Sequence, residues 1–527
     1  MVPAQPPPTP CILMASTASG GPTVLTSHLL SWLVVTPLAG AVLILLSARG
    51  RPARIRGVGL AISLLGLLLA VPLWVRYDPA GPPYQLIDQM AGPGAVGNLY
   101  MVGADGLTVL LVVLIELLGL LTFVTSWSAA NDRTPSHEAG LLILQAAMLG
   151  VVVALDARLF AVSWAVMLTM VGVLAAQSSR AGWRPIVPAA LSVAPLLAGI
   201  LMIHAAAGEA TGVLSFDLTK LQQVSLPADR QSWPFLALLA GFAAAAGSMA
   251  MAASHARDHA LLSATALVTL PGYGLARFNL AILPQAARTF VPLLAGLAMA
   301  TLLVAAVQAW RAREWHRTLT WAALGQLAVM LLGLAVIDPG ALAGSLIHPV
   351  AVALAIAPLL AIARVRAPSL GFRAGGWTLT LVAIGVPGLG GFPGTAAIVR
   401  GASQAHPLWA VAAGGGLVVI AGAVVRQAWP LLRIRGAQVS PGEVRAAEAA
   451  VLAFAALTLL IALAPGPLEA RLQPTMARVI TRLDPGYGPM FATVPGCGGP
   501  GSSVPAPSAP AGFTAIAPCD NAATTPK

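Results

Sequence analysis

Long apolar stretches recur along almost the whole chain, and this recurrence limits the possible folds more than any other feature. A helix of about 20 mostly apolar residues is long enough to cross the hydrocarbon core of a bilayer. Only 9% of the residues are charged, against about 25% in an ordinary soluble domain. A soluble globular enzyme is therefore excluded. The sequence predicts an all-α polytopic membrane protein.

The apolar windows number about fourteen, at roughly 20 residues for each crossing. They cover residues 28–48, 57–75, 105–127, 139–155, 158–177, 186–206, 234–253, 260–280, 289–309, 318–337, 341–363, 376–399, 407–428 and 447–465. An even number of spans puts both ends of the chain on the same side of the membrane.

The distribution of basic residues predicts how these spans are oriented. The net charge is +11, but the basic residues are scattered through short loops and form no domain for nucleic acid. Cytoplasmic loops of membrane proteins are enriched in Lys and Arg. Here 18 basic residues fall in odd-numbered loops and 7 in even-numbered loops. We therefore expect a multi-pass protein of the bacterial inner (plasma) membrane, with both termini on the external, periplasmic side.

The composition divides the chain into three regions. Residues 1–27 are rich in Pro and have no basic segment ahead of an apolar core, so we expect a disordered extension and not a signal peptide. Residues 28–465 form the membrane domain. Residues 466–527 form a C-terminal extension that should be disordered from about residue 484, where Pro, Gly, Ser and Ala dominate. Whether Cys497 and Cys519 pair there is left open.

The sequence contains no pattern for a cofactor. It has no glycine-rich phosphate loop, no nucleotide fingerprint after a strand and no cysteine cluster for an iron–sulfur centre. No metal site is supported by its three cysteines. Any redox chemistry in which the chain takes part must therefore use cofactors on other subunits.

Two Gly/Pro interruptions fall inside predicted spans. The first is Pro271 and Gly272 in the eighth span, and the second, in the twelfth span, contains Pro387, Gly388, Gly390, Gly391 and Pro393. Irregular backbone at membrane depth is tolerated where it is buried in protein or lines a cavity, so such breaks indicate ion or substrate paths. The alternative is that they only allow kinks and close packing. In the twelfth span the prolines and glycines predict a discontinuous helix.

Three ionisable residues within or beside the spans are candidates for a proton path. Glu116 lies midway along an apolar span, Asp156 ends the fourth span, and His348 precedes Pro349 in the eleventh. A carboxylate at membrane depth costs about 2.5–3.5 kcal/mol and therefore needs a reason. Each residue also has a structural alternative. Glu116 and His348 can be hydrogen-bonded between helices, and Asp156 can cap a turn and pair with Arg158.

Several motifs occur in an order that resembles one known family. They are Asp105-Gly106-Leu107 through Ser126-Trp127, Ala154-Leu155-Asp156 with Phe160 and Trp164, Gly272-Tyr273-Gly274-Leu275-Ala276-Arg277-Phe278-Asn279-Leu280, and Gly385-Val386-Pro387-Gly388-Leu389-Gly390-Gly391-Phe392. Together they resemble the antiporter-like subunit M (chain 4) of proton-translocating NADH–quinone oxidoreductase, respiratory complex I. The resemblance covers roughly residues 30–465.

The resemblance implies a fold, partners and cofactors. The fold is an antiporter-like inverted repeat of about fourteen helices, some of them discontinuous, with both termini outside. The partners are other membrane-arm subunits of a complex I-like assembly within the lipid bilayer, and none is a nucleic acid. NADH, FMN, iron–sulfur clusters and quinone would be bound by those partner subunits and not by this chain.

The resemblance fails at most positions where the family carries its proton-relay residues. The family has a glutamate in the fifth span, lysines in the seventh and eighth, an acidic residue in the twelfth and a histidine in the tenth. This chain has, in that order, Ala165, Ala245, Thr269, Thr395 and Gln326. His348 alone keeps its place. A Glu–Lys pair moves protons because each charge sets the proton affinity of the other, so we expect the channel of this chain to be lost or weakened.

The leading interpretation is therefore a subunit M-like component of a complex I-like oxidoreductase, with a degenerate proton channel and a role in structure or assembly. One alternative is an Mrp-type cation/proton antiporter subunit that works through Glu116, Asp156 and His348. Another is the membrane subunit of a hydrogenase or of an inorganic-carbon uptake complex. These proteins share a fold, and fold alone does not separate their functions.

Overall fold

The structure is a computed structural model of the chain. It describes residues 28–47, 52–91, 98–126, 134–178, 182–212, 214–255, 260–362, 370–433 and 441–487. The extension expected over residues 1–27 lies outside the described residues, as do Cys497 and Cys519 and all of the expected disordered tail beyond residue 487.

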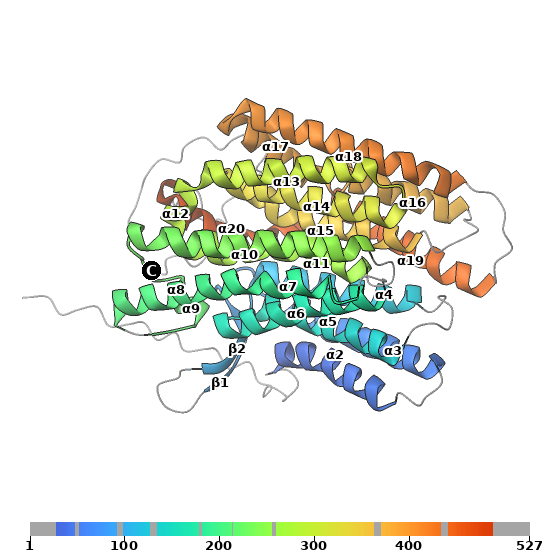
Figure 1. Cartoon of the computed structure of the whole chain (residues 1–527), viewed down its shortest axis with the longest axis horizontal. Coiled ribbons are helices and arrows are strands. Elements are labelled where there is room, and N and C mark those ends of the chain that lie inside the picture. Colours follow the sequence, from blue (N-terminus) through green and yellow to red (C-terminus); the bar gives the residue numbers. More distant parts are fainter. Residues whose placement is uncertain are drawn as a thin grey trace, which may run out of the picture.

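Long helices run side by side and make up most of the described fold (Figure 1). They are α2 (Leu29–Leu46), α3 (Pro52–Arg76), α4 (Gly106–Ser126), α5 (Pro135–Val153), α6 (Ala157–Ser178), α8 (Val193–Thr211), α10 (Ala228–His255), α11 (Ala260–Gly274), α13 (Val291–Arg311), α14 (Trp315–Ala335), α15 (Pro339–Ile362), α16 (Leu370–Ala383), α17 (Phe392–Ala405), α18 (Pro407–Arg433), α19 (Pro441–Leu463) and α20 (Gly466–Leu483). Shorter elements are α7 (Ile186–Leu191), α9 (Leu218–Leu221), α12 (Pro284–Thr289) and the π-helix η2 (Leu275–Leu280). The predicted all-α polytopic fold is confirmed.

The number of whole spans is smaller than the sequence predicts. Among the described residues, 11 helices are long and apolar enough to cross a membrane, or up to 12 if the bent pair of α19 and α20 counts as one span. The windows at 260–280 and 376–399 are each divided between two shorter pieces, α11 with η2 and α16 with α17. The structure therefore has fewer whole spans than the roughly fourteen apolar windows because some of these windows fall on interrupted helices.

The backbone differs at the two Gly/Pro interruptions. Pro271 and Gly272 do not end their helix, because α11 runs through them to Gly274 and then widens into the π-helix η2. The twelfth window is divided, since α16 ends at Ala383 and α17 begins at Phe392. Within the link, Gly385 and Gly388 have φ of 75° and 85°, a conformation that glycine adopts without steric cost.

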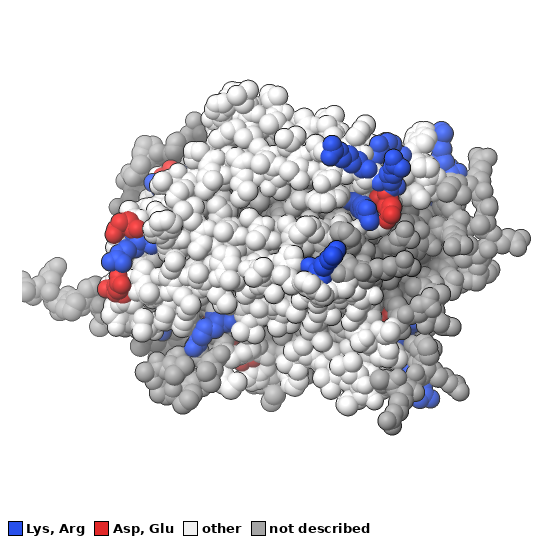
Figure 2. All heavy atoms as spheres, in the orientation of Figure 1, with Lys and Arg blue, Asp and Glu red and all other residues white. Residues whose placement is uncertain are grey.

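The surface matches a lipid environment. In Figure 2 the charged side chains lie mostly toward the two ends of the bundle, and the band between them is almost free of them. Large apolar side chains are exposed on outer helices, including Leu68 on α3, Leu303 on α13 and Val418 on α18. Apolar surface of this extent needs an apolar partner, which a bilayer supplies. Among the helices long enough to cross a membrane, α5, α14 and α15 are the most enclosed, with 89% of each apolar window buried.

A hairpin and two helices gather at one end of the bundle. Strands β1 (Gln85–Ala91) and β2 (Asn98–Ala104) pair in antiparallel fashion. The Tyr84 hydroxyl, just before β1, donates to Oε1 of Gln222 after α9, at 2.7 Å. Arg478 of α20 donates to the carbonyl of Pro83, at 3.1 Å. Helix α20 is therefore fixed against the loop that follows the second span.

Candidate functional site

His348 lies on α15 beside the break between α16 and α17. Its ring is buried, and its Nδ1 is 3.2 Å from Oγ1 of Thr395 on α17. Gln326 of α14 lies at the same place, together with Gly385 and Gly391 from the break, and the residues leave no room for a water molecule between them. The positions that the family resemblance singled out in the tenth, eleventh and twelfth spans thus meet at the broken helix.

The side chains of this group carry almost no charge. Nε2 of Gln326 donates to the carbonyl of Ala383 at 2.8 Å, which satisfies an acceptor left open where α16 ends. Oε1 of Gln326 and Nε2 of His348 are buried and have no hydrogen-bond partner among the described residues. Histidine is the member that can take up a proton at physiological pH. The group therefore contains no fixed pair of opposite charges.

Glu116 lies in a separate polar group between α3, α4 and α5. Its side chain is fully buried, and Nε2 of Gln145 donates to its Oε2 at 2.7 Å. Ser63 Oγ lies 3.4 Å from Oε1 of Gln145. Space for the carboxyl depends on Gly66, where a Cβ would lie 2.2 Å from Oε2. No basic side chain of the described residues bonds to Glu116, so this carboxyl is positioned by neutral hydrogen bonds.

Asp156 acts as a cap at the start of α6. Its Oδ1 accepts from the backbone N–H groups of Arg158 and Leu159, at 2.8 and 3.3 Å. The Arg158 guanidinium also donates to both carboxylate oxygens, at 3.1 and 2.8 Å. These contacts match the turn and ion-pair alternative stated for Asp156.

The positions of the expected Glu–Lys relay lie among packed apolar side chains. Ala165, Ala245 and Thr269 are on α6, α10 and α11, and α10 packs against the other two helices. Ala245 and Thr269 are buried, and the Thr269 hydroxyl donates within its own helix. On α6, α10 and η2, four aromatic rings contact one another, with centroids 4.5 to 6.5 Å apart; these rings belong to Phe160, Trp164, Phe242 and Phe278.

The predicted residues Glu116, Asp156 and His348 do not form one site. No hydrogen bond or ion pair among the described residues joins any two of them. Over the same described part of the chain, no group of three or more His, Cys, Asp or Glu is placed to hold a metal ion. Each residue must therefore be considered on its own.

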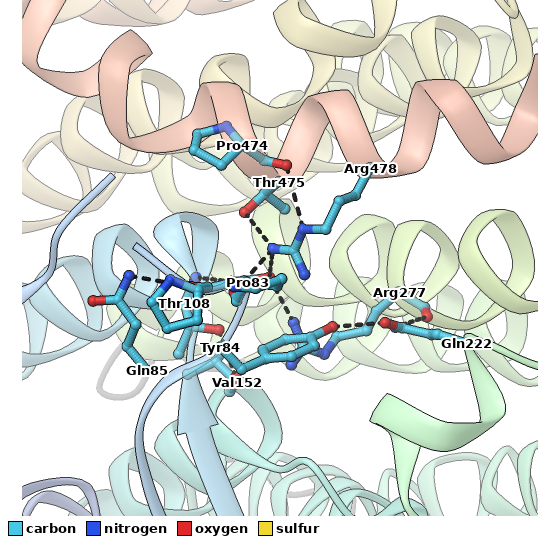
Figure 3. A network of polar contacts seen from close by, with 12 residues as sticks. Pro83, Tyr84, Gln85, Thr108, Val152, Gln222, Arg277, Pro474, Thr475 and Arg478 are labelled. Atoms are coloured by element: carbon cyan, nitrogen blue, oxygen red, sulfur yellow. Dashed lines mark hydrogen bonds and ion pairs between the residues drawn. The ribbon is translucent and has the colours of Figure 1, made fainter. Parts of the chain in front are cut away.

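A charged cluster that the sequence analysis did not identify lies at the end of the bundle near the hairpin. Asp105 accepts from Nη1 of Arg277 at 3.0 Å, and Nη2 of Arg478 is 3.7 Å from the same oxygen. Both guanidinium groups lie by the ring of Tyr84, at 5.2 and 4.8 Å from its centroid. Figure 3 shows Arg478 extending from α20 toward this ring and Arg277 lying next to it, near Gln222. The cluster joins residues from both ends of the sequence.

Asp105 is ionised in this cluster. Burial alone would raise the pKa of its carboxyl, but the positive charges of Arg277 and Arg478 and the hydrogen bonds of Thr108 hold the pKa below its usual value. Its Oδ1 also accepts from the backbone N–H of Thr108 at 2.9 Å, which makes Asp105 the N-cap of α4. The residue thus fixes a helix start and a buried cation together.

Comparison with known proteins finds sequence similarity to one group of membrane subunits. The model of the family described as NADH:quinone oxidoreductase/Mrp antiporter, transmembrane, matches residues 146–369. The chain is 26% identical over 434 residues to NADH-quinone oxidoreductase subunit M of Pseudomonas aeruginosa, covering 74% of this chain and 85% of that protein. Over these residues the chain is similar to antiporter-like membrane subunits.

Three solved structures share the antiporter-like fold. A chain of respiratory complex I from Thermus thermophilus superposes with a TM-score of 0.74 at 22% identity, covering 86% of this chain and 99% of that one. A chain of an archaeal membrane-bound sulfane sulfur reductase gives 0.75 at 14%, covering 86% and 99%. A chain of the Mrp complex from Dietzia sp. gives 0.70 at 18%, covering 90% and 100%. These similarities establish the fold, and all three neighbours are parts of multi-subunit membrane complexes.

Proposed function

We propose that this chain is a subunit M-like component of the membrane arm of a complex I-like NADH–quinone oxidoreductase, and that its own proton channel is degenerate. NADH, FMN, iron–sulfur clusters and quinone would then be bound by partner subunits. The similarity to subunit M over most of both chains supports the choice of host complex. The proposed role of the chain is to hold the membrane arm together.

One observation carries the proposal for a degenerate channel. Ala165, Ala245 and Thr269 stand where the family resemblance expects the paired glutamate and lysines. A relay of protons through an apolar interior needs groups that change charge and affect one another. Alanine and threonine do not ionise. The remaining candidates, Glu116 and His348, lie in separate neutral groups.

The proposal predicts that neither remaining candidate is required for proton pumping. The oxidoreductase would be purified with all its subunits from cells that express His348→Ala or Glu116→Gln, and reconstituted in vesicles. A residue on which proton transfer depends contributes about a hundredfold or more to its rate. We expect the number of protons pumped per NADH oxidised to stay within about twofold of the wild-type value in both variants. A loss of about a hundredfold would be expected if either residue carried the proton.

Two results would contradict the proposal in different ways. Loss of pumping with NADH oxidation intact in either variant would show that the channel is functional. Purification in mild detergent that brings down partners without NADH oxidation would exclude the host complex instead. Na⁺- or K⁺-dependent proton flux in that preparation would then favour the Mrp-type antiporter, and a hydrogenase or carbon-uptake partner would favour the third interpretation.

A further inference from the structure

A cavity of about 480 Å³ opens at the end of the bundle between the hairpin, η2 and α20. This volume lies in the range of small-molecule sites, about 300–1,000 Å³. Its charged lining consists of Asp105, Arg277, Arg478 and Arg482. Three guanidinium groups therefore face one carboxylate, and the lining carries two positive charges in excess.

The deepest of these arginines has hydrogen-bond donors left over. The side chain of Arg277 is 5% exposed, and only its Nη1 is bonded, to Asp105. Nε and Nη2 are buried and have no partner among the described residues. A buried donor destabilises the fold when nothing accepts from it. Arg277, a lining residue of the cavity, thus keeps two adjacent N–H groups that no described acceptor uses.

Neighbouring contacts hold the cluster in position. The Tyr84 ring lies against the guanidinium groups of both Arg277 and Arg478. Its hydroxyl donates to Gln222, which in turn donates to the backbone carbonyl of Arg277 at 3.3 Å. On the other side, Arg482 is fixed by a bond from its Nη1 to the carbonyl of Ala281, at 3.1 Å. The positive groups are therefore placed before any ligand binds.

The arginines lie at different depths in the cavity. The side chain of Arg478 is 31% exposed, against 5% for Arg277, so Arg478 lies nearer the mouth and Arg277 at the base. Apolar side chains complete the lining, among them Leu107 of α4, Leu346 of α15 and Val479 of α20. The cavity can therefore receive an anion attached to an apolar group as well as a free one.

We propose that this cavity binds a phosphate group, through Arg277 at its base and Arg478 and Arg482 around it. A guanidinium fork matches two phosphate oxygens at once, and such charge-assisted bonds are the strong ones. The excess positive charge suits an ion that carries one or two negative charges. The group can come from free phosphate or from the headgroup of an anionic phospholipid, since both present the same oxygens.

The test measures binding to the full chain, purified in neutral detergent with the membrane partners that accompany it. The probes are inorganic phosphate and dihexanoylphosphatidylglycerol, with dihexanoylphosphatidylcholine as the zwitterionic comparison. Each is titrated while the unfolding temperature of the chain is followed, because a ligand of the folded state raises it. We expect a saturable rise with one or both of the anionic probes. Tenfold tighter binding of the glycerol lipid than of phosphate would indicate a lipid source, and the converse a free phosphate source.

Variants then locate the site. Arg277→Lys keeps the charge beside Asp105 but removes the two unpaired donors, and Arg482→Gln removes a charge from the lining. Because charge-assisted bonds are worth about 1.5–3 kcal/mol, each variant should weaken binding about tenfold or more. Arg471→Gln is the matched control: it removes a charge from the same helix, outside the cavity lining, and should leave affinity within about twofold.

Three results would overturn the proposal. One is no change in unfolding temperature with either anionic probe. Another is equal stabilisation by the phosphatidylcholine comparison. The third is an equal loss of binding in Arg471→Gln and Arg277→Lys, which would indicate a diffuse surface charge. If Arg277→Lys fails to fold, Arg482→Gln against Arg471→Gln decides the question. The outcome is independent of whether the chain conducts protons, because no residue of the cavity is part of the proposed channel.

Discussion

Replacing Gly106 with alanine is expected to displace α20 from the bundle. A Cβ at this position would lie 1.7 Å from the carbonyl oxygen of Arg471 and 2.6 Å from its carbonyl carbon. Both atoms are backbone of α20, so no side chain can rotate away. Overpacking of this kind costs about 1–3 kcal/mol and sometimes more. A direct clash between two helix backbones should reach or exceed the upper end of that range.

The displacement would be detected by protease access and by thermal stability. Arg471 now lies on the Trp74 ring, with its guanidinium carbon 3.9 Å from the centroid, and Arg478 lies within the charged cluster. In Gly106→Ala we expect trypsin to cut at these arginines earlier than in the wild type, and the unfolding temperature to fall. Gly296→Ala on α13 is the control, because a Cβ there meets nothing within 4 Å. A variant that resists trypsin like the wild type would show that α20 does not depend on this contact.

The membrane fold could be predicted from the sequence because its signal is local. A run of apolar residues long enough to cross a bilayer has few other stable environments, and the broken twelfth span follows from the special backbone needs of Gly and Pro at positions such as Gly385 and Gly388. In the eighth span the structure matches the alternative of a helix that continues through Pro271 and Gly272. Pro271 is accommodated within α11, and the backbone changes at Leu275, where the π-helix begins.

The charged cluster could not be predicted in the same way. Asp105 and Arg277 are 172 residues apart in sequence, and no periodic pattern links them. Part of the signal was present in α20, however. Leu468, Leu472, Val479 and Leu483 recur at helical spacing between polar residues, which predicts an amphipathic helix lying against the bundle. That pattern would have shown that the arginines of α20 belong to the folded domain.

The group around His348 illustrates a third case. The family resemblance identified Gln326, His348 and Thr395 as corresponding positions, but residue types alone offered no reason to place them together. The structure does so because α14, α15 and α17 pack around the break in the twelfth span. Packing between helices that are distant in sequence therefore brings together residues that the sequence identified only through separate motifs.

Replacing Asp105 with asparagine is expected to destabilise the protein strongly at neutral pH. Asparagine is as good an N-cap as aspartate, so the bond to the backbone N–H of Thr108 can persist while the negative charge is lost. Arg277, which is 5% exposed, then remains buried without its ion-pair partner. Removing one partner of a buried pair costs about 3–5 kcal/mol. The double variant Asp105→Asn with Arg277→Met should be more stable than the sum of the single effects allows, because it leaves no buried charge unpaired.

The dependence of this loss on pH gives a sharper test. The pKa of Asp105 is lower in the folded protein than the usual value of about 3.9, so the folded state binds this proton more weakly than the unfolded state does. The stabilisation by Asp105 is thus fully present above that usual value and disappears as the pH falls through the folded pKa. The unfolding temperature of the wild type should therefore drop toward that of Asp105→Asn in acid, and the two curves of unfolding temperature against pH should converge.

Asp217→Asn serves as the matched control. Asp217 caps α9 through the N–H of Thr219 at 2.8 Å and has no ion pair among the described residues, so the curve of this variant should follow the wild type from neutral to acidic pH. Parallel curves for the wild type and Asp105→Asn would show that the carboxylate charge at position 105 does not stabilise the fold.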